Sequence, residues 1–254
     1  LEDNTTANYN VAVGYKASQL NTTGTTNTSV GSFALQTNTT GDSNTAVGYS
    51  CLDANTTADG NTAVGRSALG ANTTGANNTA VGRNALTVNT TGQYNVAIGV
   101  YALDANTTAN NNVAVGYHGM TSNTTGNANT AIGYETLYTN TQGDRNTALG
   151  FQALYTMNPS GNADSYNTGV GYHAGSNVTT GQRITAVGGQ AADAVTTATD
   201  NTAVGYAAYS GGTTASHNTA VGAYAMDAAV TGEYNTAIGR AALGALTSGA
   251  YCSG

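Results

Sequence analysis

The sequence is poor in most of the residue types that build a globular enzyme. It has no Trp, two Phe, one Pro and two Cys, and only 7% of its residues are charged. In ordinary soluble domains about a quarter of the residues are charged. A chain with so few large apolar groups would normally stay disordered, because it buries too little surface to offset its conformational entropy. The regular spacing of the residues that remain argues against disorder here.

The scarcity of positive charge argues against a nucleic-acid-binding protein. Six Lys and Arg stand against 13 Asp and Glu, which gives a net charge of -7, and no basic cluster could neutralise a row of phosphates. We therefore expect no nucleic acid partner.

No apolar run approaches the roughly 20 residues that cross a bilayer, so we expect no membrane insertion. The N-terminus has neither a charged leader nor an apolar signal core, and Leu1 and Glu2 indicate the cut end of a longer protein.

What the sequence contains instead is a repeat. The pattern N-T-A-V-G begins at Asn10 and Asn27, keeps that interval as far as Asn146, and resumes at Asn167 for the last five of its fourteen copies. We number each 17-residue unit from this leading Asn as position 1. Position 5 is then Gly in every copy. Repetition of this kind predicts a solenoid, in which each unit forms one coil that stacks on the next.

Each unit predicts two short strands and two turns. In the unit 44–60, Thr45 and Val47 alternate with Ala46 and Gly48, and this period of two is typical of a strand. A second apolar stretch, A-L, predicts the second strand. The following N-T-T-G predicts a turn, because Asn, Thr and Gly favour turn conformations. We expect an all-β fold, a parallel β-solenoid of about fourteen 17-residue coils.

The regular interval is broken once, between Asn146 and Asn167, which lie four positions further apart than the repeat requires. The intervening segment contains Pro159 and Gly161. Pro cannot donate to a strand ladder and Gly favours turns, so the extra residues should bulge out while the coil passes beneath. The expected organisation is a single solenoid over 1–254, with coils at 10–156, a loop insertion at 157–166 and coils at 167–254.

Stacking places identical side chains about 4.8 Å apart. Position 12 then becomes a column of Asn side chains, in which each amide bonds to the one above. Its members include Asn72, Asn89, Asn106 and Asn123.

The aliphatic side chains are few, about two per coil, such as Val64 with Leu69. Burying each contributes roughly 1.5 to 3 kcal/mol, whereas ordering each residue of a coil costs about 1 kcal/mol or more. We therefore expect a parallel homo-oligomer that supplies further burial through the face of the strand carrying only Ala and Gly, where another backbone can approach closely. That face comprises Ala46, Gly48, Ala63, Gly65, Ala80, Gly82, Ala131 and Gly133.

The unit N-T-A-V-G-Y with A-L and N-T-T-G resembles the head repeats of YadA-like trimeric autotransporter adhesins, whose motif has the form N-S-V-A-I-G. It is still more similar to the repeat regions of phage and bacterial tail-fibre proteins that end in an endosialidase-type chaperone domain. The resemblance covers nearly all of residues 10–250. It implies a left-handed parallel β-roll in an intertwined homotrimer.

No pattern of reactive side chains points to catalysis. The chain has no H-x-x-x-H, no C-x-x-C and no Asp-rich calcium loop. Asp53, Asp104 and Asp227 share position 10 but lie several coils apart, which is typical of a solvated surface. We expect no enzyme activity, no metal and no cofactor.

The two cysteines are expected to stay apart. Cys51 replaces a small buried residue, which predicts a packed thiol, and Cys252 falls where the next leading Asn would be. About twelve coils separate them, roughly 60 Å at strand spacing, whereas bridged Cα atoms lie within about 7 Å. Cys252 is therefore either free or an intersubunit thiol.

Position 6 predicts a surface-binding ridge. It holds Tyr in six copies and Arg in three, and such rings and guanidinium groups can stack on sugars or contact proteins. We expect a host-surface glycan or protein as partner, or else only ring stacking along the coil edge. The ridge comprises Tyr15, Tyr49, Arg66, Arg83, Tyr117, Tyr134, Tyr172, Tyr206 and Arg240.

Position 12 also begins an N-T-T pattern that accepts N-linked glycan in a eukaryotic secretory route and stays bare in a bacterial or phage protein. The glycosylation candidates are Asn4, Asn21, Asn38, Asn55, Asn72, Asn89, Asn106 and Asn123.

These patterns favour a structural and adhesive fibre segment of a phage tail fibre or surface adhesin, a rigid stalk or head that touches the host surface. Two alternatives stay open. Uncapped coil ends could template a self-assembling extracellular filament, and the recurring paired Thr could form a flat ice-binding array. We expect an extracellular, cell-surface or virion-surface location.

Overall fold

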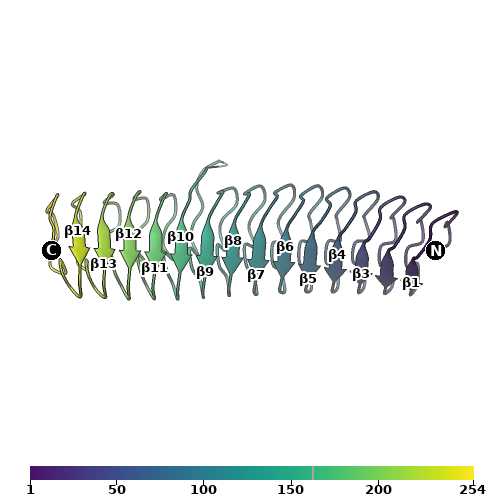
Figure 1. The fold of residues 1–254 in the computed structure, drawn as a ribbon, viewed down its shortest axis with the longest axis horizontal. Coiled ribbons are helices and arrows are strands. Elements are labelled where there is room, and N and C mark those ends of the chain that lie inside the picture. The colour runs from purple at the N-terminus through teal and green to yellow at the C-terminus, as the bar shows by residue number, and fades with distance from the viewer. Residues whose placement is uncertain (162) are drawn as a thin grey trace. The chain divides into compact units, whose positions relative to one another are not determined.

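The computed structural model describes residues 1–161 and 163–254, which form two compact units, 1–125 and 126–254. In both units the chain winds in coils with one three-residue strand each (Figure 1), and the described residues contain no helix. Unit 1 contains β1 (Val11–Val13), β2 (Thr28–Val30), β3 (Thr45–Val47), β4 (Thr62–Val64), β5 (Thr79–Val81), β6 (Val96–Ile98) and β7 (Val113–Val115). Unit 2 contains β8 (Thr130–Ile132), β9 (Thr147–Leu149), β10 (Thr168–Val170), β11 (Thr185–Val187), β12 (Thr202–Val204), β13 (Thr219–Val221) and β14 (Thr236–Ile238).

Neighbouring strands within each unit pair in parallel and in repeat register. Val47 of β3 pairs with Val64 of β4, and Val64 in turn pairs with Val81 of β5. Each repeat position therefore forms a column along its unit. This confirms the predicted all-β parallel solenoid with a 17-residue spacing.

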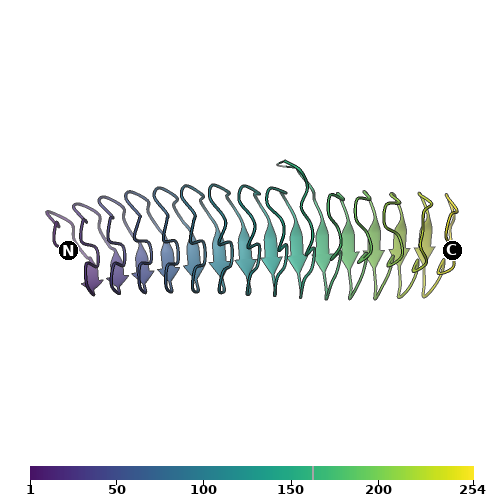
Figure 2. The ribbon, with the colours of Figure 1, turned by 180° about the vertical axis from the view of Figure 1, so that it is seen from behind.

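The prediction of a second strand at A-L is wrong. Positions 7 and 9 adopt left-handed backbone, as at Ser50 (φ 48°) and Leu52 (φ 50°), which interrupts the extended conformation of a strand. Coil-to-coil hydrogen bonding nevertheless continues there, because the Leu52 N–H donates to the Ala68 carbonyl at 3.1 Å. This segment is a stacked turn, and such turns close the coils on the side seen in Figure 2.

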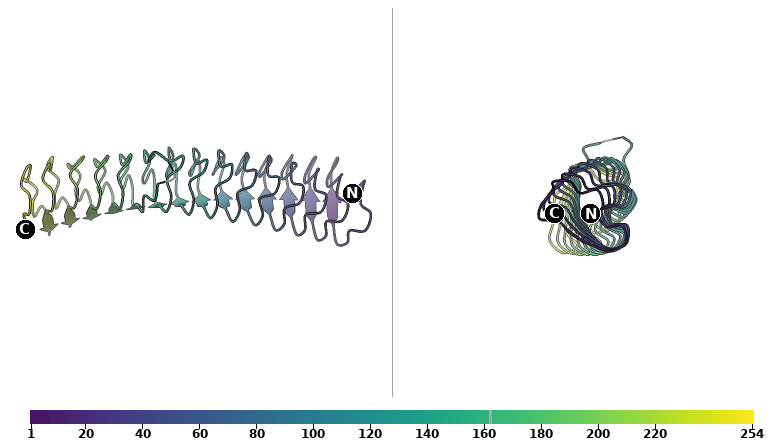
Figure 3. Two further views of the ribbon diagram at one scale, coloured as in Figure 1. Left: turned by 90° about the horizontal axis from the view of Figure 1, so that it is seen from above. Right: turned by 90° about the vertical axis from the view of Figure 1, so that its right-hand side faces the viewer.

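The interior of each coil is narrow, and Asn, Ala and Leu fill it. In the coil that begins at Asn61, five side chains from the two sides of the coil have no exposed area. Figure 3 shows the coils end on, each as a closed loop of chain. The five side chains are those of Asn61, Ala63, Ala68, Leu69 and Asn72.

The inner and outer faces of the strand are the reverse of those predicted. Ala63 at position 3 is fully buried in its own coil, whereas Val64 at position 4 is 37% exposed. The cause is volume: Leu69 and the two Asn side chains occupy the coil, so position 3 has room for a methyl group only.

The position 5 glycines are required by stacking within the chain. A Cβ atom at Gly82 would overlap the Gly99 carbonyl oxygen of the next coil, and the backbone there has φ +134°, which favours glycine.

The prediction of subunit packing through this face is therefore wrong. Its alanines point into their own coil, and its glycines adjoin the carbonyl groups of the next coil. These residues are Ala46, Ala63, Ala80 and Ala131, and Gly48, Gly65, Gly82 and Gly133.

Two ladders of buried Asn hold the coils together. At position 1, the Asn44 side-chain oxygen accepts the backbone N–H of Asn61 at 3.0 Å, and its amide nitrogen donates to the Ala58 carbonyl at 2.8 Å. At position 12, Asn89 donates to the side-chain oxygen of Asn72 at 2.8 Å. The predicted amide column is confirmed, and its buried amides are hydrogen-bonded away from water.

The coil register is kept across the longer interval between β9 and β10. Thr147 pairs with Thr168, and the Thr147 N–H donates to the Asn167 carbonyl at 2.8 Å. The connection rises above its neighbours in Figure 1. Met157 and Pro159 are nevertheless buried beside it, so part of the expected loop packs onto the coil.

Candidate functional site

All nine residues of the predicted position 6 ridge are exposed. Backbone hydrogen bonds stack them: the Ser67 N–H donates to the Tyr49 carbonyl at 2.9 Å, and the Asn84 N–H donates to the Arg66 carbonyl at 3.0 Å. The ridge is therefore a built surface feature of each unit, with side chains of successive coils at strand spacing.

The ridge is wider than predicted, because position 7 contributes to it. Phe33 lies edge-on to Tyr15 and Tyr49, with ring centroids 5.4 and 5.8 Å apart. In unit 2, the His173 ring lies 4.2 Å from that of Tyr172. The signal was present in the sequence, since position 7 is aromatic or His in several copies, but left-handed backbone after Gly was needed to place it beside position 6.

A second surface column, at position 17, was not predicted. In unit 2 the Arg183 guanidinium donates to both carboxylate oxygens of Asp200, at 2.6 and 2.8 Å, and this pairing lowers the pKa of Asp200. His217 stacks on Tyr234 with ring centroids 4.7 Å apart. These side chains satisfy one another along the column, which gives them a structural role.

The outer face of the sheet carries two uncharged columns. Position 2 is Thr in eleven copies and Val in three, and position 4 is aliphatic in all fourteen. The position 4 side chains are partly exposed, for example Ile98 at 40%.

The hydroxyl groups of turn threonines, by contrast, form hydrogen bonds between coils. The Thr73 hydroxyl at position 13 donates to the Thr90 carbonyl of the next coil at 3.0 Å. The paired Thr of N-T-T therefore cannot all present free hydroxyl groups to ice.

The predicted glycosylation column is wrong at seven of its eight positions. Those seven side chains are buried, and their amide nitrogens donate to groups of their own or the neighbouring coil, as Asn72 does to the Gly75 carbonyl at 2.9 Å and Asn123 to Asn106 at 3.2 Å. A glycan cannot be attached there without opening the ladder. Only Asn4 is exposed. The buried members are Asn21, Asn38, Asn55, Asn72, Asn89, Asn106 and Asn123.

The cysteines are separate thiols. Cys51 is fully buried, as predicted, and burial raises its pKa to about 12, so it stays protonated and unreactive. Cys252 is a free, partly exposed thiol.

Two of the three position 10 carboxylates predicted to be solvated, Asp53 and Asp104, are less exposed than expected, whereas Asp227 is exposed as predicted. Asp53, Asp104 and Asp193 are half-buried, and burial raises the pKa of each. Asp104 accepts a hydrogen bond from Thr121. One buried oxygen of Asp193 has no hydrogen-bond partner among the described residues.

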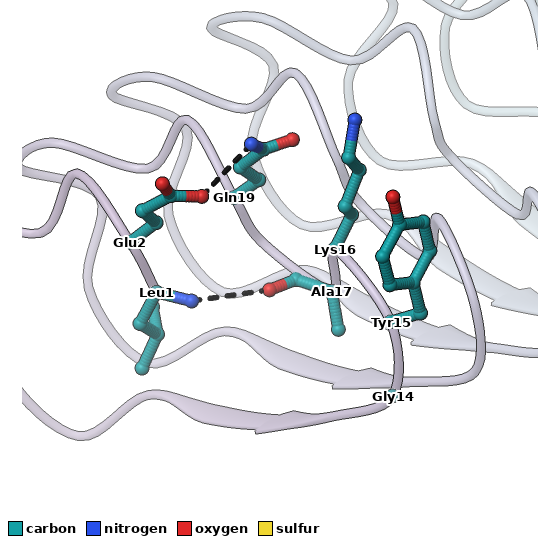
Figure 4. A pocket seen from close by; sticks show the side chains of 7 residues that line it. All are labelled: Leu1, Glu2, Gly14, Tyr15, Lys16, Ala17 and Gln19. Carbon is teal, nitrogen blue, oxygen red and sulfur yellow. Dashed lines mark hydrogen bonds between the residues drawn. The ribbon is translucent and has the colours of Figure 1, made fainter.

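A hollow at the first coil of unit 1 has polar groups that bond to one another and offers no binding site. The Leu1 amino group donates to the Ala17 carbonyl at 3.2 Å, and Gln19 donates to Glu2 at 2.9 Å (Figure 4). Its polar groups therefore bond across the crevice. The lining residues are Leu1, Glu2, Gly14, Tyr15, Lys16, Ala17 and Gln19.

Fold and surface together define a β-solenoid repeat protein. The chain matches no family model, and no curated protein or solved structure is significantly similar to it. Within 1–161 and 163–254, no group of three or more His, Cys, Asp or Glu side chains is placed to hold a metal ion. Across the same ranges, no helix has the length and apolar character to span a membrane.

Proposed function

We propose that the chain is a structural and adhesive fibre segment of a phage tail fibre or surface adhesin. It works outside the cell, without catalysis, as a parallel assembly of identical chains, a homotrimer by its resemblance to adhesin-head and tail-fibre repeats. The observation that carries the proposal is the outward column of aliphatic side chains at position 4, which is unbroken in all fourteen copies.

An exposed column of this kind suits contact with another protein. Scattered apolar side chains are normal on a surface, whereas contiguous apolar patches mark interaction sites. Val64 is 37% exposed, and Val81 and Ile98 follow it on the next two coils. No charged residue occurs at positions 2 or 4 in any copy.

A copy of the same chain fits this column best. Its aliphatic groups recur at the same strand spacing, so two columns match over many coils, whereas a globular partner would match only locally. Each aliphatic side chain that becomes fully buried contributes roughly 1.5 kcal/mol or more. A small gain per coil is thus repeated along each unit.

The test is the molar mass in solution. Light scattering on the full chain should give a multiple of 25.3 kDa. The double variant Val64→Lys with Val81→Lys should lower that mass, because charges then face the apolar column of the partner. The matched control, Thr74→Lys with Thr91→Lys, adds the same charge to exposed turn residues of the same region and should leave the mass unchanged.

Circular dichroism shows whether both variants stay folded. A folded wild-type monomer at micromolar concentration would overturn the proposal. A mass that grows without limit would replace the closed assembly with a self-assembling filament.

Ice binding is a second candidate, favoured by the position 2 threonines. Thr45, Thr62 and Thr79 lie on the uncharged outer face of neighbouring strands, and their hydroxyl groups form no hydrogen bond with other described residues. Recrystallisation inhibition by the wild type, lost in Thr62→Lys with Thr79→Lys, would support it. A wild type without that inhibition would exclude it.

A further inference from the structure

We infer that Arg66 and Arg83, with the side chains around them, form a binding site for an anionic saccharide whose acidic group is a carboxylate. The inference goes beyond the proposed fibre role, because it assigns a ligand to one short stretch of the position 6 ridge in unit 1.

The two arginines are unpaired neighbours in an acidic chain. They occupy position 6 of consecutive coils, about 4.8 Å apart at strand spacing. Arg145 and Arg183 each pair with an Asp, but no described carboxylate forms an ion pair with Arg66 or Arg83. Two adjacent guanidinium groups repel each other, and an anion bound between them removes that repulsion.

Nearby structure keeps one guanidinium in place. Arg83 lies over the ring of Tyr101, with its guanidinium carbon 4.9 Å from the ring centroid. The Tyr101 N–H also donates to the Arg83 carbonyl at 3.1 Å. An Arg held over an aromatic ring loses less freedom on binding a ligand, and its planar fork matches a carboxylate or a phosphate.

Neutral polar groups complete the surroundings. Ser67 and Asn84 directly follow the two arginines, are half-buried and make no side-chain hydrogen bond with other described residues. They offer a hydroxyl and an amide, which suit the hydroxyl groups of a sugar. Tyr49, 53% exposed, lies on the preceding coil and supplies a ring against which a sugar can pack.

Asp53, at position 10 of the coil before Arg66, forms no ion pair with either arginine. A Cβ atom at Gly70 would lie 3.6 Å from a carboxylate oxygen of Asp53, so that carboxylate packs against the turn at position 10. The combination of two cations, two aromatic rings and two neutral polar groups fits an acidic sugar better than a free ion, because a free ion would use the cations only.

The experiment is calorimetric titration of the full chain with three oligosaccharides of equal length: an oligogalacturonate, a glucan that carries phosphate and a neutral glucan. We expect the oligogalacturonate to bind and the neutral glucan not to bind. Arg66→Gln and Arg83→Gln should each weaken binding by about tenfold, the loss expected for one charged hydrogen-bonding partner. Tyr101→Leu should weaken it by a smaller factor.

The matched control is Arg183→Gln, which removes the same charge from position 17 in unit 2, outside the position 6 ridge, and should leave the affinity unchanged. Tighter binding of the phosphorylated glucan would keep the anionic site and assign it to phosphorylated saccharides. Equal binding of the neutral glucan, an equal loss in Arg183→Gln, or no binding of either anionic probe would overturn the inference.

Failure of this site and failure of the fibre proposal are measured separately. A trimer that binds no anionic saccharide would remove the site and leave the fibre role. A monomer that binds the oligogalacturonate would do the reverse.

Discussion

Tyr209 occupies position 9, where most coils have Leu, and the same coil has Gly212 at position 12 instead of Asn. The Tyr209 hydroxyl donates to the Ala215 carbonyl at 2.8 Å and accepts a hydrogen bond from Asn218 at 3.1 Å. The carbonyl at this position is the one that Asn at position 12 satisfies in other coils, as Asn72 does for Gly75. One phenol therefore replaces both the aliphatic core residue and the amide.

This exchange predicts strong coupling between the two positions. Gly212→Asn alone should destabilise the chain, because its Cβ would overlap the Tyr209 ring. Tyr209→Leu alone should cost about 1 to 3 kcal/mol, since it removes two buried hydrogen bonds, one to the Ala215 carbonyl, which keeps Asn201 as its other donor, and one from Asn218. The double variant restores the usual pair and should be more stable than either single variant. Urea unfolding measures the cycle, and additive effects would contradict the exchange.

A second prediction at this scale concerns pH. Burial raises the pKa of Asp193 above its ordinary value, so the folded state binds the proton more tightly than the unfolded chain does. The free energy of unfolding therefore falls as pH rises from the unfolded pKa through the folded pKa. Asp193→Asn should raise the melting temperature at pH 7, and this gain should vanish below the unfolded pKa.

Asp200 provides the control of opposite sign. Arg183 lowers its pKa, so its contribution to stability is present above the unfolded pKa and is lost as pH falls through the folded value. Asp200→Asn should therefore slightly lower the melting temperature at pH 7 and have no effect in acid. Equal shifts for the two variants would show that charge number, and not burial or pairing, controls the pH dependence.

At the scale of the element, the lack of a side chain at position 5 allows two coils to stack closely. Gly82→Val should destabilise the fold by more than about 3 kcal/mol, because a β-branched residue at φ +134° is strained and its Cβ would meet the Gly99 carbonyl oxygen. Thr73→Ala, which removes one hydroxyl bond to the next coil, should cost only about 1 kcal/mol.

Gly239 separates the two causes. Its backbone has φ +123°, but the nearest atom to an added Cβ is that of Ala242 at 3.9 Å. Gly239→Val should therefore cost only the backbone strain, about 1 to 3 kcal/mol. Equal unfolding midpoints for the Gly239 and Gly82 variants would show that contact between coils is unimportant.

The strands show how much of the fold can be predicted from the sequence. The 17-residue interval predicts the strands, their parallel pairing and their register, because stacking at any other offset would break the columns. Alternation shows that Thr62 and Val64 share a face, but it does not show which face is inside. Which face is inside depends on the space left in the coil, and the buried amides of Asn61 and Asn72 fill that space. The sequence hides this burial, because N-T-T-G is typical of a turn at the surface.

The surface was predictable to a similar extent. Exposure of the position 6 ridge follows from its place after the strand, and all nine members are exposed. The contribution of position 7 was not predictable, because non-glycine residues rarely adopt positive φ and Ser67, Asn84 and Tyr101 all do. The contact of Arg83 with Tyr101 depends on that backbone.

On the scale of the whole molecule, the repeat register fixes which changes of length the chain tolerates. Removing residues 78–94 joins Asn77 to Asn95 and keeps every later residue at its repeat position. This variant should fold with the β content of the parent and a similar melting temperature. Removal of 78–93, one residue fewer, shifts the junction coil out of register, and circular dichroism should show a clear loss of cooperativity.

The connection between β9 and β10 indicates which changes of repeat length can accumulate in the gene. The longer interval there is absorbed locally, and Thr147 still pairs with Thr168. Unequal crossing-over between neighbouring copies adds or removes whole units, which the ladders accept without change. A duplication of any other length must be carried outside the coil. Related chains should therefore differ in length mostly by whole repeat units, with the remainders confined to protruding connections.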